Sequence, residues 1–301
     1  MIYSNPEVAR AVGEDPQSAP IPELHKAMFQ FAELFVKRSW QATPEDLHAM
    51  RAAGANDRDL AEWLQIASIQ TWFTNSADAG GIPMDGDTVA GPVMARERAF
   101  YHAQPPATPC PATDPSEVSA LGWLQAPSTG AQYESAERWA LNHFGFVPNL
   151  FKAISGCPDF YPRHQLALEL LDAPLSKSLP VSLHALVRAT VIALNHSDYF
   201  EPTARALLLR ETQGVEDFDA LRTDPIGRVQ GQQSQVVLQF VHKMVKNAYK
   251  ITGKDAQSFR DAGLSDETYV EVFNTVAIQQ SLDRLANCIG VAADAEPLLA
   301  Q

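Results

Sequence analysis

In almost every periodic segment of the chain, hydrophobic residues recur at positions i, i+3, i+4 and i+7 rather than at alternate positions. This spacing places apolar side chains along one face of an α-helix. Residues 57–80 show the pattern clearly, with Leu60, Trp63, Leu64 and Ala67 on one stripe. The pattern predicts an all-α protein.

Residues typical of helix caps stand at the ends of these segments. Residues 43–46 (Thr-Pro-Glu-Asp) open a short helix that Gly54 closes, and residues 265–267 (Ser-Asp-Glu) open a long helix that Gly290 closes. Hydroxyl and carboxylate side chains accept hydrogen bonds from the free N–H groups of a first turn, while glycine adopts the left-handed conformation that ends many helices. Pattern and caps therefore predict the same helices.

An internal repeat appears when the sequence is laid on itself with an offset of 209 residues. Residues 30–85 then match residues 239–294 without a gap, with 16 identities in 56 positions. We interpret this match as a duplicated three-helix half unit. The predicted helices are 23–41, 43–53 and 57–80 in the first copy, and 232–250, 252–262 and 265–289 in the second.

The repeat and the proline distribution suggest domain boundaries. Residues 105–115 contain five prolines and cannot hold a regular helix, so we expect a linker over residues 86–128. The N-terminal half unit is then residues 1–85, and residues 129–301 form one complete helical domain. The apolar face of the half unit must pack on the complete domain or on another chain.

Composition and charge exclude several classes of protein. Of 301 residues 46% are hydrophobic, and the net charge is −13, without a basic run. This composition excludes a disordered chain, and the negative charge argues against nucleic acid or an anionic membrane as partner. Because no apolar stretch has the length of a signal core or a membrane span, we expect a cytoplasmic protein.

Three segments resemble a known superfamily. Residues 145–151 read Gly-Phe-Val-Pro-Asn-Leu-Phe, residues 193–200 read Ala-Leu-Asn-His-Ser-Asp-Tyr-Phe, and residues 284–290 read Arg-Leu-Ala-Asn-Cys-Ile-Gly. They are similar to the peroxidase-related branch of the AhpD-like and carboxymuconolactone decarboxylase superfamily. The resemblance covers about residues 129–292, and the repeat adds residues 30–85. It implies an all-helical bundle, a homo-oligomer, and an active centre at a helix start after a small-residue turn.

The sequence departs from that family at its redox centre. The family's alkylhydroperoxidase motif has a glutamate, two cysteines and a histidine, and the matching positions here are Ala185, Ser197, Phe200 and Ala204. Serine and phenylalanine cannot supply the thiolate and the resolving thiol that a dithiol peroxidase requires. We therefore expect negligible hydroperoxidase activity from this site.

Ionisable residues remain around the same position. His184 and Arg188 are spaced i, i+4 on one predicted helix, with Asn195 on nearly the same stripe. We predict that Arg188, Asn195 and Tyr199 bind an anionic small molecule, and that the catalytic groups are the side chains that follow: His196, His184, Asp198 and Ser197. His184 or His196 would transfer the proton.

A purely structural interpretation of these residues stays open. Arg188 can pair with a nearby acid such as Glu169, and Ser197 or Asp198 can cap the helix whose first turn contains Pro202. No cofactor is implied, because the chain has no glycine-rich phosphate loop, and its eight histidines and three cysteines show no metal-ligand spacing.

Three functions therefore compete. The favoured one is a cofactor-independent acid–base enzyme, of decarboxylase, lyase or hydrolase type, on a small organic acid or lactone. The second is a thiol oxidoreductase that uses Cys157 or Cys288. The third is a non-catalytic helical binding protein whose pocket has lost its chemistry.

Overall fold

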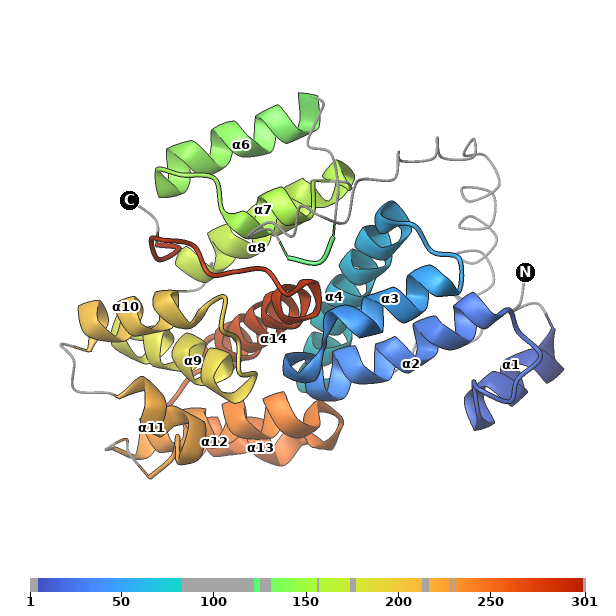
Figure 1. Ribbon diagram of the computed structural model, residues 1–301. Coiled ribbons are helices and arrows are strands. Elements are labelled where there is room, and N and C mark those ends of the chain that lie inside the picture. The colour runs from blue at the N-terminus through green and yellow to red at the C-terminus, as the bar shows by residue number, and fades with distance from the viewer. Residues whose placement is uncertain are drawn as a thin grey trace.

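The computed structural model describes residues 5–82, 122–124, 131–155, 157–173, 177–212, 217–227, 229 and 231–299, without the side chains of residues 131–133 and 158. Within these residues every regular element is a helix, and no strand occurs (Figure 1). The predicted all-α class is confirmed for this part of the chain.

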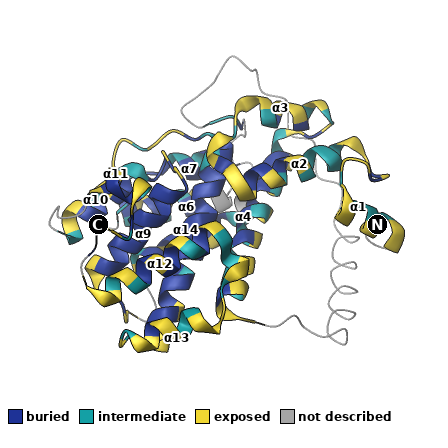
Figure 2. Cartoon of the chain, turned by 90° about the horizontal axis from the view of Figure 1, so that it is seen from below, coloured by how far each residue is buried: buried dark blue, intermediate teal, exposed yellow. Residues whose placement is uncertain are grey.

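Two helices of 24 residues, α4 (Asp57–Gly80) and α14 (Asp266–Ile289), pack against each other. Helix α14 also contacts α8 (Tyr161–Asp172), α9 (Val181–Leu194) and α12 (Gln232–Asn247), and it lies in the middle of the molecule (Figure 1). Most residues of α9 and α14 are buried (Figure 2). These two helices are the centre of the core.

Four elements recur at a constant distance along the chain. The first set is α2 (Glu23–Arg38), the 3-10 turn η2 (Ser39–Gln41), α3 (Pro44–Ala52) and α4. The second set is α12, η4 (Ala248–Lys250), α13 (Gly253–Asp261) and α14. Each element of the second set begins and ends 209 residues after its counterpart. Across the sets, η2 contacts α14 and η4 contacts α4.

The ends of these elements share their local chemistry. Helices α3 and α13 both start with a capping box, formed by Thr43 with Asp46 and by Thr252 with Asp255. Helices α4 and α14 both end in a left-handed glycine, Gly81 (φ 61°) and Gly290 (φ 68°). The predicted helices 57–80 and 265–289 match these bounds to within one residue.

The first set is docked on the second. The Ser68 hydroxyl donates to the Ser281 carbonyl at 2.9 Å, and the Tyr269 hydroxyl donates to the Ala79 carbonyl at 2.8 Å. On the inner side of α4, Leu60 and Leu64 are fully buried. The expectation that the apolar face of residues 57–80 is covered is therefore confirmed for Leu60 and Leu64, by the same chain, whereas Phe73 stays 61% exposed.

The remaining helices surround this core. They are α1 (Pro6–Glu14), α6 (Ala131–Phe144), α7 (Asn149–Ala153), the 3-10 turn η3 (Pro158–Phe160), α10 (Glu201–Glu211) and α11 (Phe218–Thr223). Helix α1 has no buried residue and lies at the periphery, whereas α10 and α11 pack on α9 (Figures 1 and 2). Most of the predicted linker 86–128, both of its boundaries and Cys110 lie outside the described residues.

Candidate functional site

The segment after α9, residues 195–199, carries five of the predicted site residues. His196 N–H donates to the Ala193 carbonyl at 3.2 Å, and Ser197 N–H donates to the Ile192 carbonyl at 3.1 Å, which closes the helix as a Schellman turn. Such a turn needs a left-handed residue, usually glycine, and here His196 takes this conformation with φ 49°. The backbone therefore holds an exposed imidazole at a position where a side chain is costly.

Arg188 and His184 lie inside the protein, between α9 and its neighbours. Arg188 is 2% exposed and donates from Nη1 to Asp172 Oδ1 at 2.9 Å and to the Leu171 carbonyl at 3.3 Å. The structural interpretation, in which Arg188 pairs with a nearby acid, is therefore confirmed, but the acid is Asp172 and not Glu169, which accepts from the Trp139 indole N–H at 2.8 Å. Burial lowers the pKa of His184 to about 4, so its imidazole is neutral at physiological pH.

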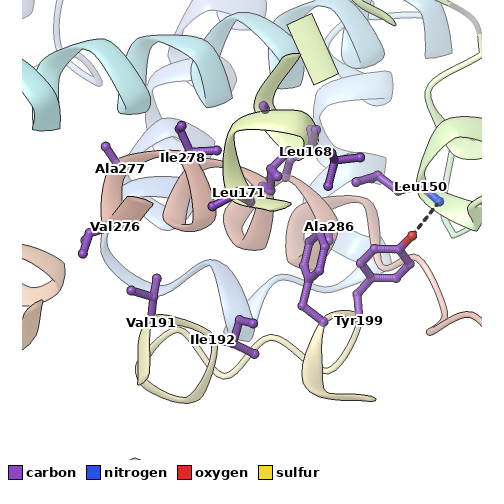
Figure 3. Packing of buried hydrophobic residues seen from close by; sticks show 14 of the residues in the cluster. Leu150, Leu168, Leu171, Val191, Ile192, Tyr199, Val276, Ala277, Ile278 and Ala286 are labelled. Atoms are coloured by element: carbon purple, nitrogen blue, oxygen red, sulfur yellow. Dashed lines mark hydrogen bonds between the residues drawn. The ribbon is translucent and has the colours of Figure 1, made fainter. Parts of the chain in front are cut away.

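Asp198 and Tyr199 point away from each other. The side chain of Asp198 is 96% exposed. Helix α10 begins at Glu201 with Phe200 as its N-cap residue and has no side-chain cap, so the predicted cap by Ser197 or Asp198 was wrong. The buried Tyr199 hydroxyl donates to Asp294 Oδ2 at 2.6 Å and accepts from Leu150 N–H at 3.3 Å (Figure 3). Tyr199 thus ties the turn to α7 and to the C-terminal segment.

Asn195 and Ser197 belong to a buried polar cluster with α14. Asn195 Nδ2 donates to Asp283 Oδ2 and Gln279 Nε2 donates to Asp283 Oδ1, both at 2.9 Å. Asp283 is fully buried, which raises the pKa of its carboxyl to about 7. The buried Ser197 hydroxyl also faces this carboxyl and, with the two amides, counteracts part of the rise in its pKa.

The predicted site residues differ in their exposure. His184, Arg188, Ser197 and Tyr199 are buried, and Asp198 faces solvent. Of the seven predicted residues, Asn195 alone borders the cleft that lies between the two sets of helices.

This cleft has a volume of about 490 Å³. Its walls come from the ends of α2 and α12, the turns η2 and η4, and the C-terminal halves of α4 and α14. Four pairs of lining residues are separated by 209 positions: Val36 and Val245, Lys37 and Lys246, Trp40 and Tyr249, Asn75 and Arg284. Equivalent positions of the two sets thus face the same cleft.

Two cations in the cleft lack a carboxylate partner among the described residues. Arg284 is 9% exposed, forms no hydrogen bond or ion pair with any of these residues, and its pKa is lowered by burial to about 10. Lys246 Nζ donates to the Leu194 carbonyl at 3.3 Å, and burial lowers its pKa. Lys37 instead pairs with Glu33 at the surface, and Asp78 is the one acidic side chain on the described walls.

His196 packs against Trp40, which lines the cleft. The imidazole and the indole have centroids 5.1 Å apart, and Lys246 Nζ lies 5.6 Å from the indole centroid. Burial, together with the positive charges of Arg222 and Lys246, lowers the pKa of His196. The imidazole is therefore neutral at physiological pH and able to accept a proton.

Sequence reasoning missed Arg284, Lys246 and Trp40. The repeat contained the signal, because Val36 and Lys37 are identical to Val245 and Lys246, next to the aromatic pair Trp40 and Tyr249. Arg284 has no such signal, since its counterpart is Asn75.

The two described cysteines are buried thiols. Burial raises the pKa of Cys157 to about 12 and also raises that of Cys288. Because the thiolate is the nucleophile, burial suppresses the reactivity of both.

Other kinds of site have little basis in the described part of the chain. No three histidine, cysteine or acidic side chains gather there as metal ligands. None of its helices combines the length and the apolar character needed to cross a bilayer. No protein-family model and no curated protein matches this sequence.

Proposed function

We propose that the chain arose by duplication of a three-helix half unit within the AhpD-like and carboxymuconolactone decarboxylase superfamily. The constant 209-residue offset between α2–α4 and α12–α14, together with the matching capping boxes and terminal glycines, supports the duplication. The superfamily assignment rests on the sequence segments at 145–151, 193–200 and 284–290.

We further propose that the cleft between the two sets binds a small organic anion and that the protein is a cofactor-independent acid–base enzyme. The observation that carries this proposal is Arg284, which lines the cleft, is 9% exposed, and has no carboxylate partner among the described residues. Burial lowers the pKa of Arg284, the nearby Asp283 carboxyl offsets this in part, and a ligand carboxylate that forms a bidentate pair with the guanidinium would offset it further.

Each group has a distinct role in this proposal. Arg284 and Lys246 bind the carboxylate of the substrate, and His196, which packs on Trp40 at the edge of the cleft, is the proposed base for a proton on a C–H or O–H group of the substrate. Arg188 pairs with Asp172 through Nη1 alone and does not line the cleft, so we assign to Arg284 the anion-binding role first expected of Arg188. Asn195 keeps its place at the cleft and positions Asp283 behind the wall.

Thermal unfolding in the presence of small carboxylates tests the binding. A carboxylate at about one hundred times its Kd adds about 2.7 kcal/mol of stability, which raises the Tm by on the order of 5 °C. Arg284→Met should abolish this shift, whereas Lys254→Met, which removes an exposed charge elsewhere, should retain it. If the shift survives in Arg284→Met, the cleft is not the binding site.

The two alternatives are separated by turnover. A non-catalytic binding protein would use the same cleft without converting its ligand, so loss of turnover in His196→Ala with binding retained supports the enzyme. A thiol oxidoreductase would lose activity in Cys157→Ala or Cys288→Ala, but burial of both thiols argues against it.

We also propose that the protein is cytoplasmic and that it forms a homo-oligomer. Several large apolar side chains are exposed on the chain, and their burial between subunits would stabilise an oligomer. Among the described residues that do not line the cleft, the most exposed are Leu209, Ile82, Val181 and Phe73.

A further inference from the structure

The cleft contains a pair of aromatic side chains as well as cations. Trp40 on η2 and Tyr249 on η4 are 209 residues apart, and both line the cleft. Trp40 is 38% exposed and Tyr249 is 73% exposed. Large aromatic side chains are usually buried. Two exposed aromatic side chains on one cleft therefore indicate an apolar or aromatic ligand.

Contacts within the protein fix the indole of Trp40. His196 lies against it at a centroid distance of 5.1 Å, with the rings tilted by 45°, and the Lys246 ammonium lies 5.6 Å from its centroid. Trp40 and Tyr249 make no ring contact with each other. The indole is therefore a preoriented platform with surface left for another planar group.

The cationic groups lie on the same cleft as these rings. Lys246 connects the two features, because its ammonium contacts the indole and also carries one of the unpaired charges. A volume of about 490 Å³ is far larger than a formate or an acetate needs, and lies within the range of sites for ring-sized ligands.

We infer that the ligand of this cleft is an aryl carboxylate, whose ring packs on Trp40 and faces Tyr249 while its carboxylate binds Arg284 and Lys246. This inference rests on the proposed function and specifies its substrate class. A simple aliphatic acid would satisfy the cations but leave the aromatic surface in water. A neutral aromatic compound would cover the rings but leave Arg284 without a counter-ion.

Calorimetric titration of the full chain with three matched probes tests the inference. Benzoate has both features, cyclohexanecarboxylate has the charge without a π face, and benzyl alcohol has the ring without the charge. Aromatic stacking typically favours the planar ligand by about threefold to tenfold in Kd. Benzoate should therefore bind about threefold to tenfold more tightly than cyclohexanecarboxylate, and benzyl alcohol should bind more weakly than either.

Single substitutions test the contribution of the aromatic side chains separately from that of the positive charge of Arg284. Trp40→Leu should remove the preference for benzoate while both carboxylates still bind, and Tyr249→Phe should retain the preference that Tyr249→Leu reduces. Arg284→Met should weaken both carboxylates alike. Circular dichroism and the Tm of each variant confirm that it is folded before its titration is interpreted.

The outcomes distinguish the inference from the proposed function. Equal Kd values for benzoate and cyclohexanecarboxylate, both raised by Arg284→Met, overturn the aryl preference and leave the anion site standing. If both carboxylates bind Arg284→Met with the same Kd as the wild type, the proposed anion site itself is wrong. Failure of benzoate to bind the wild-type chain overturns the inference as well.

Discussion

His196 combines a costly backbone conformation with a side chain next to the cleft. A left-handed residue with a Cβ is less stable than glycine by about 1–2 kcal/mol, and the Schellman turn after α9 imposes this conformation on His196. Strain of this kind persists where a side chain is needed for function.

Replacing His196 by glycine and by alanine separates the effect of backbone strain on stability from the effect of losing the imidazole. Both variants lose the contact with Trp40, but His196→Gly alone relieves the backbone. We expect His196→Gly to unfold about 2–4 °C above His196→Ala, since the difference is about 1 kcal/mol. A Tm for the glycine variant at or below that of the alanine variant would show that the turn is unstrained.

Asp283 gives the fold a pH dependence with a definite sign. Its carboxyl has a pKa of about 7 in the folded chain and about 3.9 when unfolded, so between these values the folded state binds the extra proton. The free energy of unfolding therefore falls as pH rises from about 4 to about 7, by up to about 1.4 kcal/mol per pH unit, and is level above that range.

Asp283→Asn removes this contribution, because the amide stays neutral at every pH. Urea unfolding of both proteins between pH 4.5 and 8 gives the difference in stability, in which groups such as His184 cancel. We expect the wild type to lose stability relative to Asp283→Asn as pH rises from 4.5 to about 7, and the difference to stay level above that range. A difference independent of pH would mean that Asp283 titrates normally.

At the scale of elements, the helices of the two sets were predictable from the sequence. Local chemistry determines their ends: Thr43 and Asp46 cap α3, and Gly81 and Gly290 end α4 and α14. The start of α10 was not predictable in this way. Asp198 and Glu201 have capping-box spacing, but Tyr199 and Phe200 are anchored in the core and turn the Asp198 carboxylate to solvent.

The two terminal glycines provide a matched comparison. Both are left-handed, but a Cβ on Gly81 would meet nothing within 4 Å, whereas a Cβ on Gly290 would lie 2.1 Å from Cε2 of Trp123. Trp123 N–H donates to the Ile289 carbonyl at 2.8 Å, so the tryptophan backbone is held at the helix end.

Alanine at each position should therefore have different effects. Gly81→Ala should cost about 1 kcal/mol from backbone strain alone, and Gly290→Ala should cost a further 1–3 kcal/mol or so from overpacking against Trp123. Chemical denaturation of both variants measures the gap. Equal losses would mean that Trp123 moves away freely.

At the scale of the whole molecule, docking of α2–α4 on α12–α14 creates the cleft. Neither set has the full group of Trp40, Lys246 and Arg284, because the tryptophan belongs to one set and the two cations to the other. The candidate site could not be predicted from periodicity for this reason: its residues are more than 200 positions apart and meet only after the helices pack.

The seven residues predicted from the sequence were chosen as neighbours along one helix and its following turn. In the folded chain these side chains have different partners. Arg188 donates a hydrogen bond to Asp172 on α8, and the Tyr199 hydroxyl donates one to Asp294 near the C-terminus. Asn195 remained at the cleft because it ends α9 beside α14.

A crystal structure of the full chain with bound benzoate tests the central claim most directly. The account predicts the carboxylate within hydrogen-bonding distance of the Arg284 guanidinium, about 2.7–3.2 Å, in the cleft between the two sets of helices. Benzoate bound elsewhere, for example beside Arg188 or on the outer surface, with the Arg284 cleft empty, would contradict it.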